Sequence, residues 1–244
     1  MHRIYLEKIP SIQEIRLSDR DQLHHLFEVI RARIGDIVEI FDGKGNWVEA
    51  EIEKIDRREG VFKVTKRMQS GKNKKSLFLT IGCSLIKINK MELIVEKLTE
   101  IGVERIIFFE TTRSQIRRKD LKNKLQRFEK IAISALKQCG NRFLPRIEFL
   151  KFQDILNMSH EFDLALMPCL KKDIDSLKDV LVKEKEKRNI ILVIGPEGDF
   201  SPEEVNLATK HGFFLVTLGE NILRSETAAI VCAGFIKLFY ANGN

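Results

Sequence analysis

The feature that most constrains the fold is an alternation of apolar runs and helical patterns between residues 77 and 219. A helical pattern at 91–101 ends before Gly102, and a second long helix is expected from about Lys119 to Cys139. Strands that alternate with helices in this way are typical of a mostly parallel α/β sheet. The strand candidates are LFLTIG (77–82), RIIFFE (105–110), DLALM (163–167), NIILVIG (189–195) and FFLVTLG (213–219).

The N-terminal part of the chain has a different pattern. Apolar and polar residues alternate over 34–67, and turn residues at 42–46 separate the first two runs. This alternation predicts a small antiparallel sheet or barrel. The stretch MQSGKNKKS (68–76) has no apolar pattern, so we place a domain boundary there. The sequence therefore predicts two domains, 1–72 and 73–244.

One stretch, IGPEGDFSPEE (194–204), follows a predicted strand and begins a helix. Ser201 suits the N-cap, Pro202 the first helical position, and Glu204 completes a capping box. Two glycines and a proline before this cap fix an unusual backbone path, which serves either a tight turn or a ligand. The stretch lacks GxGxxG and GK[ST], and Glu197 would repel a phosphate, so a bound ligand would be one without phosphates.

Three predicted strands end in segments suited to one binding site: MPC (167–169), GPEG (195–198) and LGENILRSETAA (218–229). Ligands of parallel α/β sheets bind outside the carboxyl ends of the strands, so these segments are expected to form the walls of a single site. Arg224 and Glu226 stand at the start of a helix, where they either act on a ligand or only cap the helix.

Composition narrows the class of protein. Forty-two Lys and Arg residues against 35 Asp and Glu give a formal charge of +7, which fits a polyanionic partner or a solubilising surface. The four cysteines are far apart without CxxC spacing, which argues against a zinc site and disulfides. No run reaches the length of a membrane span and the N-terminus is charged, so we expect a cytoplasmic protein.

These motifs resemble those of the RsmE family, SPOUT-class methyltransferases that modify a uridine of small-subunit (16S) ribosomal RNA at the N3 imide nitrogen. GPEGDFSPEE and LGENILRSETAA resemble its paired C-terminal motifs, and HHLFEVIRARIGD with FDGKG resembles its N-terminal domain. KMELIVEKLTEIGVERI, TTRS and KIAISALKQCGNRFLP resemble the segments between them. The chain departs from the family pattern at Asp199, Cys139 and Asn141.

The resemblance implies a small PUA-like β-barrel domain that binds RNA (1–72), followed by a SPOUT methyltransferase domain (73–244). The second domain is a mostly parallel sheet with helices on both faces and a C-terminal trefoil knot, and it acts as a homodimer without a metal. The implied cofactor is S-adenosylmethionine. The residues expected to hold it are Met167, Ile194, Gly195, Pro196, Glu197, Gly198, Leu218, Gly219, Ile222, Leu223, Arg224, Thr227 and Ala228.

Methyl transfer to an imide nitrogen requires alignment of donor and acceptor and removal of the imide proton. Arg224 is the expected cation that stabilises the deprotonated imide. Glu226 or Glu197 is the expected base, although either could instead hold Arg224 in place. The residues expected to contact RNA, unless they only form a solvated basic face, are Arg31, Arg33, Arg113, Arg117, Arg118 and Lys119.

Two other functions stay open at this point. A SPOUT methyltransferase could act on another RNA such as tRNA, because the knot motifs report on the cofactor more directly than on the substrate. A non-catalytic RNA-binding factor of ribosome assembly could retain the same two domains. A dinucleotide-dependent dehydrogenase is disfavoured because the phosphate fingerprint is absent.

Overall fold

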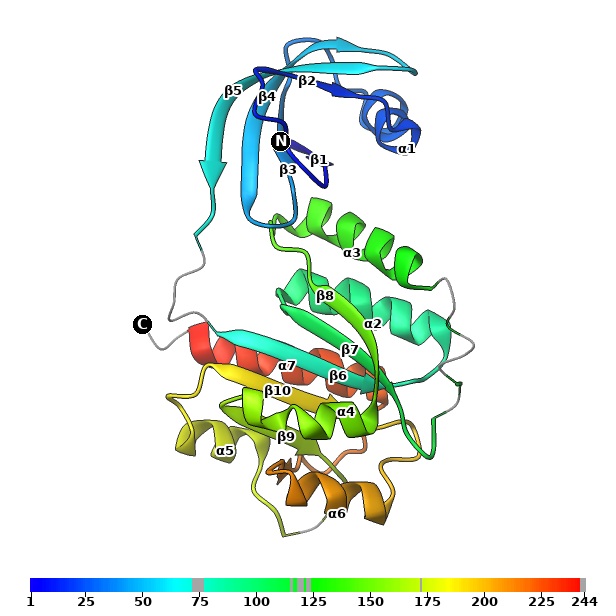
Figure 1. Ribbon diagram of the computed structural model, residues 1–244, viewed down its shortest axis with the longest axis vertical. Coiled ribbons are helices and arrows are strands. Elements are labelled where there is room, and N and C mark those ends of the chain that lie inside the picture. Colours follow the sequence, from blue (N-terminus) through cyan, green and yellow to red (C-terminus); the bar gives the residue numbers. More distant parts are fainter. Residues whose placement is uncertain (72–76, 115, 118–120, 122–123, 172, 242–244) are drawn as a thin grey trace. The chain divides into compact units, whose positions relative to one another are not determined.

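The computed structural model describes residues 1–71, 77–114, 116–117, 121, 124–171 and 173–241 (Figure 1). The chain forms two compact units. The first comprises Met1–Lys72 together with Leu136–Leu144, and the second comprises Asn73–Ala135 and Pro145–Asn244. A short stretch from the middle of the chain thus belongs to the N-terminal unit.

The first unit is built around a curled five-stranded sheet with the strand order β1-β3-β4-β5-β2. The three strands predicted between residues 34 and 67 are confirmed as β3, β4 and β5, which pair antiparallel. Alternate residues along these strands, such as Val38 and Ile40 of β3 and Phe62 and Val64 of β5, form the core of this unit and pack with a short helical segment that ends in a π-helical turn. The elements of this unit are β1 (His2–Tyr5), β2 (Glu14–Leu17), α1 (Arg20–His24), η1 (His25–Val29), β3 (Ile37–Phe41), β4 (Asn46–Ile55) and β5 (Gly60–Gln69).

The segment Leu136–Leu144 packs on the turn between β3 and β4. The backbone amide of Gly45 donates to the Arg142 carbonyl at 3.1 Å, and that of Leu144 donates to the Gly43 carbonyl at 2.7 Å. A side chain at position 45 would lie 2.6 Å from the Phe143 ring, so only glycine allows this approach. The glycines of the DGKG turn therefore serve the packing of a distant segment.

The second unit contains a six-stranded sheet in which every pair of neighbouring strands is parallel, with the order β11-β9-β10-β6-β7-β8. The α/β class predicted from the sequence is confirmed. The strands are β6 (Phe78–Ser84), β7 (Arg105–Glu110), β8 (Arg146–Lys151), β9 (Leu164–Pro168), β10 (Asn189–Ile194) and β11 (Phe214–Val216). The helices are α2 (Ile88–Ile101), α3 (Leu125–Cys139), α4 (Phe152–Asn157), η3 (Ser159–Glu161), α5 (Leu177–Lys183), α6 (Pro202–Lys210) and α7 (Ser225–Ala241).

Helices cover both faces of this sheet (Figure 1). On one face, Phe109 of β7 and Val193 of β10 pack with Phe152 of α4 and Ala208 of α6. On the other face, α7 lies against β6 and β10 and also packs on α2. Alternate residues of the central strands are buried in opposite directions, which explains why these strands read as continuous apolar runs.

Some boundaries differ from the prediction. The long helix α3 begins at Leu125 rather than near Lys119, which lies outside the described residues. The last strand is limited to Phe214–Val216, because the backbone turns away before Gly219, whose φ is +110°. Strand β8 was not predicted; its sequence RIEFLK mixes polar and apolar residues, as an edge strand can.

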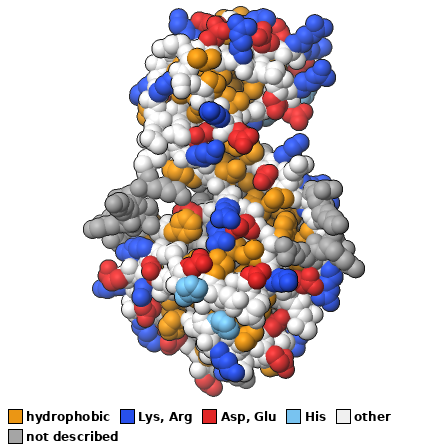
Figure 2. Space-filling model, in the orientation of Figure 1, with side chains coloured by type: hydrophobic (Ala, Val, Ile, Leu, Met, Phe, Trp, Pro, Cys, Tyr) orange, Lys and Arg blue, Asp and Glu red, His pale blue; other side chains and the backbone are white. Residues whose placement is uncertain are grey.

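Charged side chains are mixed on the visible surface. Figure 2 shows Lys and Arg side chains interspersed with Asp and Glu on that face. No helix in the described part of the chain is long and apolar enough to cross a membrane. Within the same residues, no group of three or more His, Cys, Asp or Glu side chains is arranged to hold a metal ion.

Candidate functional site

A cavity of about 800 Å³ lies at the carboxyl ends of β9, β10 and β11, within the second unit. The three segments selected from the sequence are therefore brought together by the fold, at the sheet edge where parallel α/β folds bind ligands. The walls are formed by the loops after these strands and by the start of α7. The described residues that line the cavity are 168–171, 173–174, 194–197, 199, 217–223, 225 and 228.

The lining combines apolar and acidic groups. Ile194, Leu218, Ile222 and Leu223 supply apolar surface, which suits a flat aromatic group. Among the described lining residues, the carboxylates outnumber the one lysine, Lys171. These carboxylates are Asp173, Glu197, Asp199 and Glu220. Such a lining favours a cationic ligand and disfavours a phosphate.

The GPEG turn (195–198) forms one wall, and packing explains its first glycine. A side chain at Gly195 would lie 3.0 Å from the ring of Phe200, which stacks on Phe109 and Phe152 in the core. The backbone amide of Asp199 donates to the Pro196 carbonyl at 3.0 Å and closes the turn. The GPEG stretch is thus both a tight turn and a wall of the cavity, so the two explanations for its glycines and proline, a tight turn and a ligand, are compatible.

Asp199 occupies a left-handed backbone conformation with φ of +57°. Its carboxylate accepts hydrogen bonds from the backbone amides of Phe200 at 2.8 Å and of Leu170 at 3.2 Å. Asp tolerates this conformation better than most residues because its side chain can bond to nearby backbone. The departure from the family pattern at Asp199 therefore adds a link between the loops after β9 and β10.

The start of α6 has the predicted cap. Ser201 Oγ accepts a hydrogen bond from the Glu204 amide, Glu204 Oε2 accepts one from the Ser201 amide, and Pro202 is the first helical residue. Glu204 has a second role, because its Oε1 accepts hydrogen bonds from the amide and hydroxyl of Thr112, at 2.8 and 3.1 Å. The loop after β7 is thereby attached to the start of α6.

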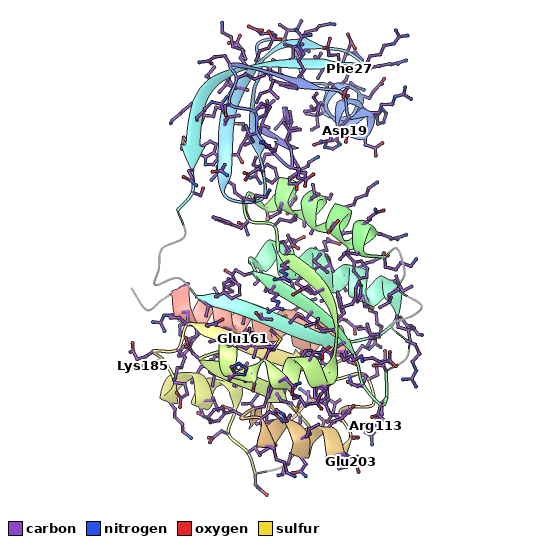
Figure 3. All side chains as sticks on the ribbon, in the orientation of Figure 1. Asp19, Phe27, Arg113, Glu161, Lys185 and Glu203 are labelled. Carbon is purple, nitrogen blue, oxygen red and sulfur yellow. The ribbon has the colours of Figure 1, made fainter. Side chains whose placement is uncertain are left out.

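Arg113 belongs to that loop and is directed at the GPEG turn. Its Nη1 donates to the Gly198 carbonyl at 2.6 Å. Figure 3 shows Arg113 and Glu203 near each other beside α6, and the charge of Arg113 helps to lower the pKa of Glu203, after hydrogen bonds to Ser201 and to its own backbone amide. Arg113, which the sequence predicts to contact RNA, thus also supports the GPEG turn that forms a wall of the cavity.

A cluster of three charges stands beside the cavity. Lys90 Nζ in the first turn of α2 lies 2.6 Å from Glu197 Oε1 and 3.2 Å from Glu226 Oε1. The pKa of Lys90 is raised, chiefly by its hydrogen bond to Glu197 and then by Glu226, so the ammonium stays charged. Lys90 was not among the site residues predicted from the sequence. A sequence signal for Lys90 does exist: the N-terminus of a helix disfavours a cation, and the first turn of α2 contains this lysine and no acidic residue.

The two candidate bases therefore pair with Lys90 and not with Arg224. Glu226, the second residue of α7, is 8% exposed, whereas Arg224 is exposed. Within the described part of the chain, the guanidinium of Arg224 has no hydrogen bond or ion pair. The carbonyl of Arg224 accepts the amide of Ala228 at 2.8 Å as part of the start of α7.

The cavity contains most of the residues predicted to hold a cofactor. Those that line it are Ile194, Gly195, Pro196, Glu197, Leu218, Gly219, Ile222, Leu223 and Ala228. Four others do not line it: Met167 is buried in the core, and the remaining three are Gly198, Arg224 and Thr227. The loop after β9 beyond residue 169 was not predicted, and Ser225, within the predicted segment 218–229, had no role assigned to it; its Oγ donates to the Gly195 carbonyl at 2.8 Å.

The predicted RNA contacts fall in both units. Arg31 and Arg33 are exposed in the first unit, and Arg31 has a left-handed φ of +58°. In the second unit, Arg117 Nη1 donates to Glu110 Oε1 at 2.8 Å. Arg118 and Lys119 lie outside the described residues.

Comparison with known families gives two matches. Residues 73–237 match a family model described as an RNA methyltransferase domain, and residues 17–65 match one described as an RNA methyltransferase PUA domain. Together the two models cover both parts of the chain.

Several similar proteins share a name. Ribosomal RNA small subunit methyltransferase E of Buchnera aphidicola is 30% identical over 98% of this chain and 94% of its own length. The protein of that name from Bacillus subtilis is 26% identical over 89% of this chain and 87% of its own. A crystal structure of ribosomal RNA small subunit methyltransferase E from Neisseria gonorrhoeae bound to S-adenosyl methionine is also similar. It has a TM-score of 0.85 and 26% identity, over 98% of each chain. With its PUA-like unit, its parallel sheet and these matches along nearly its whole length, the chain belongs to the ribosomal RNA small subunit methyltransferase E family of SPOUT-class RNA methyltransferases.

Proposed function

We propose that this protein transfers a methyl group from S-adenosylmethionine to the N3 imide nitrogen of a uridine in small-subunit (16S) ribosomal RNA. The observation that carries the proposal is the cavity at the ends of β9, β10 and β11, in a chain of this family. The Neisseria relative with the same fold is bound to S-adenosyl methionine. An acidic and apolar lining suits that molecule, which has an aromatic base and two cationic groups.

The cofactor would be held by the loops that line the cavity. Backbone groups of the GPEG turn and of residues 218–223 can bond to an adenine and a ribose, and Ile194, Leu223 and Ala228 can pack on them. The cofactor supplies a methyl group on a sulfonium, which is transferred by in-line displacement. The protein must therefore align the acceptor nitrogen with that methyl group and exclude other geometries.

The acceptor nitrogen carries a proton that has to be removed. Glu226 is the stronger candidate base, because it is buried beside the cavity, while Glu197 lies in the cavity wall itself. The exposed guanidinium of Arg224 has no partner within the described part of the chain, so it is available to stabilise negative charge on the imide. The acid–base chemistry is thereby assigned to the first turn of α7, to Arg224 just before it, and to the GPEG turn.

RNA would be bound by both parts of the chain, with 1–72 as the RNA-binding domain and 73–244 as the methyltransferase domain. Arg31 and Arg33 are exposed and can contact phosphates. Arg113 and Arg117 follow β7, and Arg118 and Lys119 continue the same basic run in the sequence. An arginine has five donors, so Arg113 can contact a phosphate while it retains its bond to Gly198.

The proposed assembly is a homodimer whose second domain carries a C-terminal trefoil knot. Exposed apolar side chains on α7 support the dimer: Val231 is 52% exposed and Leu238 is 66% exposed. The strand order, in which β10 lies between β9 and β6, and the bond from Ser225 to Gly195 support the knot. A cytoplasmic location is part of this proposal, because the proposed substrate is ribosomal RNA.

The test is methyl transfer from labelled S-adenosylmethionine to small ribosomal subunits that lack the modification, followed by mapping of the labelled nucleotide. Label at the N3 of one uridine is the expected result. Label only in transfer RNA would replace the substrate, and cofactor binding without transfer to any RNA would favour a non-catalytic assembly factor. Arg224→Ala and Glu226→Gln should lower the rate, whereas Lys210→Ala, an exposed change on α6, should not.

A further inference from the structure

Lys90 occupies a position that helix electrostatics do not favour. It is the third residue of α2, where the partial positive charge of the helix N-terminus attracts acidic side chains and repels a lysine. The first turn of α2 has no acidic residue of its own to compensate. Compensation comes instead from two carboxylates of other segments, Glu197 in the GPEG turn and Glu226 in α7.

The two oxygens of Glu226 have different surroundings. Oε1 lies 3.2 Å from Lys90 Nζ. Oε2 is buried and has no hydrogen-bond partner in the described part of the chain. A buried carboxylate oxygen without a donor is costly, and such exceptions in native proteins call for a specific cause. A donor on a bound ligand would satisfy this oxygen.

The cluster also connects Glu226 to the cavity. Glu197 lines the cavity and Glu226 does not, but both carboxylates reach the same ammonium. Ser225, which precedes Glu226, and Ala228, two residues after it, line the cavity as well. Lys90 therefore fixes Glu226 at the edge of the space where a substrate would meet the cofactor.

We propose that Lys90 is a positioning residue for methyl transfer, which holds Glu226 through Oε1 so that Oε2 accepts the proton of the N–H group to be methylated. This inference rests on the proposed function. In the reaction the N–H bond breaks and its proton passes to Oε2. The new N–C bond forms as the C–S bond of the sulfonium breaks, and the electron pair of that bond goes to sulfur. Glu226 then returns the proton to water.

The experiment compares Lys90→Met with Lys97→Met in the full-length protein. Lys97 is a matched control because it lies on the same helix and also pairs with two carboxylates, Glu96 at 2.7 Å and Glu100 at 2.9 Å, away from the cavity. The measurements are single-turnover methyl transfer, KM for the RNA, and S-adenosylmethionine affinity by calorimetry. Lys90→Met should lower the transfer rate at least about tenfold, with KM and cofactor affinity within about twofold of the wild type. Lys97→Met should match the wild type.

Two further variants separate positioning from structural support. Lys90→Arg, which keeps the charge, should recover part of the rate lost in Lys90→Met. Because Lys90 acts through Glu226, adding Lys90→Met to Glu226→Gln should slow transfer no further. If Lys90→Met does not fold, the comparison of Lys90→Arg with wild type and with the double variant Lys90→Arg/Glu226→Gln decides the same question.

Equal rates for Lys90→Met and Lys97→Met would overturn the inference, as would full additivity with Glu226→Gln. A loss confined to cofactor affinity would overturn it too, because that result assigns Lys90 to support of the GPEG turn. The wild type serves as the reference for the proposed function. A wild-type protein that methylates neither ribosomal nor transfer RNA would refute the proposed function together with this inference, whereas an active wild type with an equally active Lys90→Met would refute the inference alone.

Discussion

Replacement of Glu39 by glutamine should destabilise the N-terminal unit strongly. Glu39 of β3 is 1% exposed and accepts hydrogen bonds from two guanidinium groups. Arg3 Nε bonds to Oε1 at 2.7 Å, and Arg142 bonds to both oxygens, at 3.1 Å from Nε and 2.5 Å from Nη2. Arg142 belongs to the segment Leu136–Leu144, so this carboxylate links that segment to the sheet.

The magnitude follows from burial. Removing one partner of a buried ion pair costs about 3 to 5 kcal/mol, because the remaining charge stays buried without compensation. The side chain of Arg142 is 27% exposed, so water screens part of its charge and the lower value, about 3 kcal/mol, applies. A unit of this size has a urea m value of about 1 to 1.5 kcal/mol/M, so the unfolding midpoint should fall by about 2 to 3 M.

The assay uses the single tryptophan of the chain. Trp47 lies in the N-terminal unit, and the guanidinium carbon of Arg142 stands 3.9 Å from the centre of its ring. Trp47 fluorescence in urea therefore reports unfolding of this unit. The matched control is Glu53→Gln on the adjacent strand β4, whose exposed carboxylate lies 3.8 Å from Lys63 and contributes under about 0.5 kcal/mol. Equal midpoints for the two variants would refute the reasoning.

The dependence on pH provides a second check of the same cluster. Burial raises the pKa of Glu39, but the hydrogen bonds and charges of Arg142 and Arg3 outweigh burial and leave the pKa lowered. A carboxyl with a lowered folded pKa stabilises the fold above its unfolded pKa of about 4.3, and this contribution disappears as the pH falls through the folded value. The difference between wild type and Glu39→Gln should therefore be full at pH 7 and shrink below about pH 4.

Three further predictions concern the second unit. Arg113→Ala removes the bond to the Gly198 carbonyl and should weaken S-adenosylmethionine binding about three- to tenfold in calorimetry, whereas Lys210→Ala should not. Asp199→Ala should have a free energy of unfolding about 1 kcal/mol lower than Asp199→Gly, measured by thermal unfolding, because both variants lose the carboxylate but only glycine suits φ of +57°. Equal stability of the two variants would contradict this. Burial raises the pKa of the Cys83 thiol, and raises that of Cys232 to about 12, so a thiol reagent at pH 8 should spare both in the folded protein and modify the other two cysteines first.

The central strands of the second unit could be predicted because a parallel strand buried on both faces is a continuous apolar run. β10 (Asn189–Ile194) is the clearest example, and the run ends where the cavity begins. The cap of α6 could be predicted equally well, since Ser201 and Glu204 bond to each other's backbone, three residues apart. These features are determined by the local sequence.

Other features depend on contacts between distant parts of the chain, and no local pattern encodes them. The helical pattern that ends at Cys139 does not reveal that Leu136–Leu144 packs with the N-terminal unit. Gly45 could be assigned to a turn, but its need for glycine comes from Phe143, almost a hundred residues later. Lys90 was missed for the same reason, because its two carboxylates come from the GPEG turn and from α7, both distant in the sequence.

The GPEG turn shows how such distant contacts prepare a site. Ser225 bonds to the carbonyl of Gly195 and Arg113 to the carbonyl of Gly198, whereas Lys90 bonds to the side-chain carboxylate of Glu197. The two backbone contacts come from α7 and from the loop after β7, so the four-residue turn is held at both ends by separate segments. A wall fixed in this way loses little conformational entropy when a ligand binds, which raises affinity without any further contact. Because Arg113 is also a candidate phosphate contact, the same turn joins the cofactor cavity to the surface where RNA would bind.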